Sequence, residues 1–211
     1  MHILEIVAFL MAIAALFVSA EILRHRGVAP DTTRRYTHAA GASAAAVLPA
    51  LVTVTECVAL GVLIAGALAW TRSRGLLGSV HEVARPTLGA ALLPLGLALA
   101  APIGWPQPAA YALGALTVGL ADPAAAVIGE RFPGPRWRVW RGTKSLGGSL
   151  AFAAVAIAIG LIATGWAPLD YRAIVGIAVG LAIVEGSLGY GLDNLVVPPL
   201  AVFGWRAVIG V

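Results

Sequence analysis

Four charged residues in the second half of the chain stand inside or directly beside long apolar runs: Asp122, Lys144, Glu185 and Asp193. A charged side chain at the centre of a membrane helix costs about 2.5–3.5 kcal/mol on insertion scales, so an acid in such a run is a functional candidate. Carboxylate oxygens are the ligands that Mg²⁺ prefers, and Mg²⁺ is commonly shared with substrate phosphates. These residue types therefore indicate metal and phosphate chemistry at an apolar site.

Asp122 directly precedes Pro123 near the end of its apolar run. In a regular helix it would lie about 9 Å from the end of that run. Pro123 would remove the helical hydrogen bond to Gly119 and leave backbone groups free beside the acid. Alternatively, Asp122 caps a helix that starts at Pro123. Capping explains a solvated Asp-Pro pair better than one embedded in a membrane, so we favour Asp122 as a catalytic or metal-binding residue.

The segment RGTKSLGGS, which begins at Arg141, leads into the next apolar run. A lysine, hydroxyl groups and bare glycine backbone at a helix N-terminus can cradle a phosphate. We therefore expect Lys144, Ser145, Gly148 and Arg141 to bind the phosphate-bearing cofactor. The segment is not a P-loop, because Thr143 stands where that motif has its second glycine. The alternative is a flexible basic loop.

A third constellation starts at Glu185 and ends in Asp193-Asn194, with three glycines between them. The glycines make a continuous regular helix unfavourable. Glu185, Asp193 and Asn194 offer oxygen ligands, and together with Asp122 they form the metal set that we predict. A helix C-cap followed by a polar turn is the alternative.

Two basic residues and a histidine open an earlier apolar run. Arg35 and His38 are three residues apart, so in a helix they share a face. They could contact a phosphate or a lipid headgroup, but an ordinary interfacial anchor is the interpretation that we favour.

The composition decides which elements hold these residues. Hydrophobic residues make up 60% of the 211 residues and charged residues only 11%, against about 25% charged in a soluble domain. This excludes a water-soluble enzyme and a disordered chain. The net charge is +4, but the basic residues cluster in short loops, as membrane orientation requires, so we expect no nucleic-acid partner. The single cysteine, Cys57, excludes a disulfide within one chain.

The long apolar runs predict helices rather than strands of a membrane barrel. We expect one domain over 1–211, an all-α polytopic bundle of seven or eight transmembrane helices with the motif region at about 109–199. The tract from His38 to Trp70 is too long for one span and should form two helices that meet near Thr53 to Glu56. The other helices are expected at 3–23, 87–103, 109–128, 146–164 and 172–188, with a tail at 196–211 that spans or half-inserts.

With two helices in the tract at 38–70, the loops at 24–37, 72–85 and 129–146 fall on one side. They contain every lysine and arginine except Arg172 and Arg206. The positive-inside rule then predicts an outside N-terminus and a multi-pass protein of a bacterial-type inner membrane, with the basic loops and the active site on the cytoplasmic side.

Together these segments resemble the dolichol kinase and phytol kinase family. The residues from Asp122 to Phe132, followed by Lys144-Ser145-Leu146-Gly147-Gly148-Ser149, are similar to its signature G-D-x-x-A-x-x-x-G-x-x-F … K-S-x-E-G-S. The segments RRYTH at 34–38 and DNLVVP at 193–198 are similar to its R-K-x-x-H and D-N-x-x-x-P segments. Two positions depart from the signature, with Ala121 in place of Gly and Gly147 in place of Glu.

The resemblance implies a membrane enzyme that phosphorylates a lipid alcohol, such as a polyprenol, phytol or diacylglycerol, with CTP and a divalent metal such as Mg²⁺. Lys144 and nearby arginines would hold the triphosphate, and Asp122 and Asp193 would bind the metal or position the lipid hydroxyl. Phosphatidate cytidylyltransferases use the same nucleotide but attack its α-phosphate, and their longer acidic signature is absent. A small transporter, with the acids as ion sites, is the alternative from another class.

Overall fold

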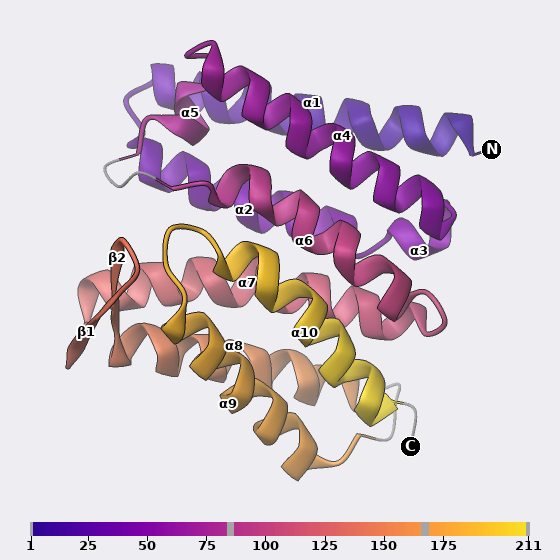
Figure 1. The fold of residues 1–211 in the computed structure, drawn as a ribbon, viewed down its shortest axis with the longest axis vertical. Helices are drawn as coiled ribbons and strands as arrows, with labels where there is room; N and C mark the ends of the chain where they lie inside the picture. Colours follow the sequence, from indigo (N-terminus) through magenta and orange to yellow (C-terminus); the bar gives the residue numbers. More distant parts are fainter. Residues whose placement is uncertain (1, 84–86, 166–168, 210–211) are drawn as a thin grey trace.

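The computed structural model describes residues 2–83, 87–165 and 169–209. Within these residues the chain forms helices that run side by side, with one small hairpin (Figure 1). The elements are α1 (Ile3–His25), α2 (Pro30–Ala45), α3 (Leu48–Leu51), α4 (Val54–Ser73), α5 (Gly78–His81), α6 (Gly89–Gly104), α7 (Pro108–Arg131), β1 (Arg136–Val139), β2 (Gly142–Ser145), α8 (Leu146–Ala163), α9 (Tyr171–Ser187) and α10 (Asp193–Ile209).

The long apolar tract is divided near Thr53 as predicted, but α2 already ends at Ala45 and the short helix α3 stands between it and α4. Helix α4 begins at Val54, directly after Thr53, whose side chain accepts a hydrogen bond from the backbone N–H of Glu56. Glu56 in turn accepts from the backbone N–H of Thr53, which completes a capping box. Helix α2, however, begins at Pro30 and not near His38, because a proline in the first turn needs no backbone hydrogen bond there.

Two other helices are longer than expected. Helix α7 continues through Asp122 and Pro123 to Arg131, so the alternative that Asp122 caps a new helix is wrong. Helices α2, α8 and α10 all pack along α7, which continues past the proline. Helix α10 begins at Asp193 and includes Pro198 and Pro199.

Four helices, α1, α4, α7 and α8, are long and apolar enough to cross a membrane. Helix α6 is apolar but shorter, and the lengths of α2, α9 and α10 also fall below that of a full span. The outer surface is apolar as well, since Leu4 and Met11 on α1 are 82% and 67% exposed. The fold is therefore all-helical as predicted, apart from the hairpin, with four of the expected seven or eight spans supported by length and composition.

Small residues allow the helices to approach closely, as is typical of membrane bundles. A Cβ atom at Gly96 of α6 would lie 2.2 Å from the backbone oxygen of Asn194, and one at Gly114 of α7 would lie 2.4 Å from Cγ2 of Val202. Both contacts hold α10 against its neighbours. They fix where α10 begins, and so where Asp193 lies.

The predicted basic loops lie at one end of the bundle. The hairpin, α5 and the α9–α10 turn are found at this end, whereas the start of α1 and the end of α10 lie at the other (Figure 1). Arg24 at the end of α1 contacts Glu82 after α5, which joins two of these loops. Arg85, which belongs to the loop at 72–85, lies outside the described residues.

Candidate functional site

Three carboxylates from three different helices meet at the basic end of the bundle. Asp122 of α7, Glu185 of α9 and Asp193 of α10 each contribute a carboxylate oxygen, and these oxygens lie within 4.8 Å of one another. The side chain of Glu185 is buried, and those of Asp122 and Asp193 are largely shielded. Three converging carboxylates form a donor set that fits a hard divalent cation such as Mg²⁺.

Lys144 lies between two of these acids. Its ammonium group donates to Asp193 Oδ2 at 2.8 Å and forms a second ion pair with Glu185. Burial by itself would lower the pKa of Lys144, but the negative charges of Asp193, Glu185 and Asp122 outweigh it and raise this pKa. Lys144 therefore stays protonated and places a permanent positive charge inside the acidic cluster.

The hairpin positions Lys144. Strands β1 and β2 are antiparallel, and Trp137 lies opposite Lys144. Directly opposed residues project on the same face of a hairpin. The Trp137 indole N–H donates to the carbonyl of Gly186 at 2.7 Å, which fixes this face against the end of α9. We expected only a loop over 129–146; the alternation Arg-Trp-Arg-Val from Arg136 to Val139 is the signal that predicts a strand.

The glycine-rich segment between α9 and α10 brings Glu185 and Asp193 together, and the expected helix break there is confirmed. A Cβ atom at Gly189 would lie 2.1 Å from the carbonyl oxygen of Trp140, in the hairpin turn. Gly191 has a φ of +87°, and its Cβ would lie 2.3 Å from the backbone nitrogen of Gly89. Side chains at these positions would force the turn away from both neighbours.

The Asn194 side chain contacts a different part of the molecule. It is buried, and its amide donates to the carbonyl of Gly89 on α6 at 3.0 Å. This bond joins the start of α10 to the start of α6 and gives Asn194 a structural role. The carboxylate of Asp193 accepts from the Asn194 backbone N–H through Oδ1, while Oδ2 faces Lys144.

The predicted phosphate-binding residues lie around the start of α8. Helix α8 begins at Leu146, as expected, and Ser145 is its N-cap, with its hydroxyl accepting from the backbone N–H of Gly148 at 3.2 Å. A Cβ atom at Gly147 would lie 1.9 Å from the carbonyl oxygen of Phe132 at the end of α7. The glycines therefore let α8 begin in close contact with α7.

Arg141 does not reach the acidic cluster through any hydrogen bond or ion pair among the described residues. Its guanidinium carbon lies 4.9 Å from the ring centre of Tyr190 and 5.2 Å from that of Trp140. Cation–π contact with both rings holds it in the hairpin turn. The binding of the nucleotide by Arg141 stays a prediction.

His38 was interpreted above as an interfacial anchor, and the structure corrects this. Its side chain is only 9% exposed, and its Nε2 atom lies 3.5 Å from Oδ2 of Asp122 and 3.2 Å from the carbonyl oxygen of Val118. A carbonyl oxygen only accepts, so the hydrogen bond to Val118 requires the proton on Nε2. Arg35 shares the α7-facing side of α2 with His38, as expected, and pairs with Glu130 near the end of α7.

Arg34 is a residue to which the analysis of the sequence alone assigned no role. It is half-buried, and the negative charges of Asp122 and Asp193 attract its guanidinium. A Cβ atom at Gly89 would lie 2.8 Å from Nη2 of Arg34 and 2.6 Å from the Asn194 amide nitrogen. Arg34 therefore lies beside the turn that positions Asp193.

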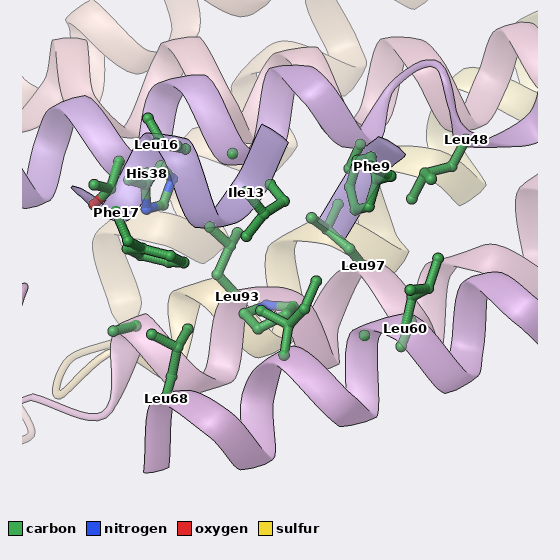
Figure 2. A pocket seen from close by; sticks show the side chains of 18 of the residues that line it. Phe9, Ile13, Leu16, Phe17, His38, Leu48, Leu60, Leu68, Leu93 and Leu97 are labelled. Carbon is green, nitrogen blue, oxygen red and sulfur yellow. The ribbon is translucent and has the colours of Figure 1, made fainter. Parts of the chain in front are cut away.

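Arg34 and His38 also line an apolar groove between α1, α2, α4 and α6. Figure 2 shows His38 close to Leu16 and Phe17 at one end, with Phe9 and Leu48 at the other. Apolar side chains of α4 and α6, among them Leu60 and Leu93, complete the lining. His38 thus contacts Asp122 of the acidic cluster and also lines the groove.

The described residues thus bring together three carboxylates, a lysine, an arginine and a histidine from distant parts of the chain, next to an apolar groove. Such a site can bind a divalent cation, carry the charge of a phosphate group and receive a molecule with one polar end. Comparison with protein families, with curated proteins and with solved structures finds no match to this chain.

Proposed function

We propose that this protein is a multi-pass membrane kinase that transfers the γ-phosphate of CTP to a lipid alcohol. One observation carries the proposal: His38 lies between the acidic cluster, through its 3.5 Å approach to Asp122, and an apolar groove. A lipid alcohol has one polar group on an apolar chain, so its hydroxyl would lie at His38 and its chain in the groove. The resemblance of the motifs to those of lipid-alcohol kinases supports the same assignment.

In the reaction the lipid hydroxyl oxygen attacks the γ-phosphorus of CTP. A new oxygen–phosphorus bond forms, the bond between the γ-phosphorus and the β,γ-bridging oxygen breaks, and CDP leaves with the electron pair. Asp122, the acid beside the groove, accepts the hydroxyl proton. A divalent cation held by Asp122, Glu185 and Asp193 would neutralise phosphate charge.

The cationic residues of the chain handle the triphosphate. Lys144 lies among the carboxylates, where its ammonium group would bind a phosphate group next to them. Arg34 supplies a second positive charge close to Asp122 and Asp193. The Nε2–H of His38, held by the Val118 carbonyl, keeps the imidazole in one orientation beside Asp122.

The shorter helices would complete a bundle of seven or eight spans, because α2, α9 and α10 lie alongside the four longer apolar helices. The positive-inside rule would place the basic end, with the acidic cluster, in the cytoplasm. CTP would then reach Lys144 from water, and the lipid would reach His38 from the bilayer.

The deciding experiment uses purified protein in lipid bilayers with Mg²⁺ and CTP carrying label on either the α- or the γ-phosphate. The acceptors are a polyprenol, phytol, diacylglycerol and phosphatidate. Label passing from the γ-position to an alcohol supports the kinase. Label from the α-position on phosphatidate would establish a cytidylyltransferase instead, and no transfer to any lipid would favour a transporter.

A further inference from the structure

The apolar groove is lined mostly by hydrocarbon side chains. Its basic side chains, Arg34 and His38, lie with Thr37 at the end next to the acidic cluster, whereas the other polar pair in the lining, Cys57 and Tyr111, contact each other. At the far end, Phe9 and Leu48 close it (Figure 2). A molecule that fills the groove must therefore be polar at one end and apolar along the rest of its length.

Helix α2 provides a series of positions along the groove. His38, Gly41 and Ala45 are three and four residues apart and all line it, so they follow one face of the helix. Their spacing predicts that Ala45 lies about 10 Å beyond His38 along the helix axis. An extended chain advances about 1.2 Å per bond, so roughly nine carbon atoms would separate a hydroxyl at His38 from Ala45.

Gly41 leaves room in the middle of the groove. A Cβ atom there would meet only Cδ2 of Leu16, at 3.8 Å, which is ordinary contact. A larger side chain would project across the space between α1 and α2. Close packing of α2 against α1 therefore does not require glycine at position 41.

We infer that this groove holds the substrate's hydrocarbon chain in an extended form, and that the side chains at 41, 45 and 48 determine how much chain it accepts. The inference rests on the proposed function, because it places the hydroxyl beside His38 and Asp122. The groove positions the hydrocarbon chain but adds little to the affinity for it, since the bilayer that the chain leaves is as apolar as the groove lining. Filling it should therefore reduce productive binding sterically, in a manner that depends on chain length.

The first test measures binding without catalysis. Dodecanol carrying a photoreactive diazirine at its terminal carbon is irradiated with wild-type protein in bilayers in the absence of CTP, and adducts are mapped by mass spectrometry. We expect them on the segments that contain Phe9, Leu48 and Leu60, because these residues lie at the far end or side of the groove. Adducts confined to outward residues such as Met11 and Val62 would overturn the inference without any variant.

Gly41→Leu is the informative variant and Gly66→Leu its matched control. A Cβ atom at Gly66, on the exposed face of α4, would meet nothing within 4 Å. Because an overfilled apolar space is strongly unfavourable, Gly41→Leu should lower labelling of the groove segments about tenfold. Gly66→Leu should label like the wild type. Unchanged labelling of a folded Gly41→Leu protein would contradict the inference.

The second test measures chain-length preference in the transfer assay. Ala45→Leu should reduce phosphorylation of hexadecanol about tenfold more than that of octanol, because only the longer chain must pass Ala45. An equal loss for both alcohols would indicate a merely structural effect and contradict the inference. Groove labelling without any phosphate transfer would refute the kinase proposal alone, whereas transfer without groove labelling would refute only the inference.

Discussion

The Nε2 atom of His38 lies 3.5 Å from Oδ2 of Asp122, and this contact joins the groove-lining half of the molecule to the half that holds the carboxylates. His38 belongs to α2 and Asp122 to α7, which pack along each other. The contact requires α7 to continue through Pro123, since a helix that began there would turn Asp122 into a cap. It makes Asp122 the acid of the cluster that is best placed to meet a hydroxyl in the groove.

Asp122→Asn should lower lipid phosphorylation at least about 100-fold, because asparagine keeps the shape but removes the charge that a metal or a transferring proton requires. Membrane insertion and folding should be preserved, since a shielded charge is deleted. The transfer assay and monodispersity in detergent measure the two effects. Asp170→Asn is the control, because Asp170 is the N-cap of α9 and asparagine caps equally well. Wild-type turnover in Asp122→Asn would remove this acid from the site.

Lys144→Met should both abolish transfer and destabilise the protein. It leaves Glu185 and Asp193 without their common cation, and breaking a buried ion pair in this way costs about 3–5 kcal/mol. The double variant Lys144→Met/Glu185→Gln should recover much of the lost thermal stability while remaining inactive, because the two residues interact directly. Thermal unfolding in detergent, followed beside transfer, measures this coupling. Additive losses would show that the ion pair does not form.

Gly147→Ala should destabilise the protein, although alanine usually favours a helix over glycine. The added Cβ would lie 1.9 Å from the carbonyl oxygen of Phe132, so α8 and α7 would have to separate. For the same reason, glutamate at this position, as in the lipid-alcohol kinase signature, would not simply add an acid to the site. Gly176→Ala on α9 is the matched control, since its Cβ would meet nothing within 4 Å, and it should leave thermal stability unchanged or slightly raised. Equal unfolding temperatures for the two variants would contradict the close packing of α7 and α8.

Single cysteines should reveal which end of the bundle faces the cytoplasm. In a Cys57→Ala background, cysteines at Thr32, Ser73 and Arg136 should be protected from an impermeant reagent outside intact cells. A cysteine at Pro106, between α6 and α7, should react. The physical reason is that the basic end stays in the cytoplasm during insertion. Labelling of the first three positions with protection of the fourth would show the opposite orientation.

Local features of the sequence were enough to predict the helical class and several element ends. Apolar runs predict helices because a membrane leaves no water to satisfy exposed backbone groups. Thr53 with Glu56 marks the start of α4 through a capping box, and the glycines before Asp193 mark the end of α9. The acids were recognisable because a charge in an apolar run is costly wherever the helix lies.

Only the tertiary structure decided that these acids lie close to one another. Which helices pack together depends on small residues at particular depths, such as Gly96 against Asn194, and no helical periodicity encodes the partner. The hairpin therefore brings Lys144 to Glu185 and Asp193, while α2 brings His38 to Asp122. The same packing lets the Asn194 amide donate to the backbone carbonyl of Gly89. Such a contact joins residues that are remote in the chain, so it depends on how the helices are arranged in space.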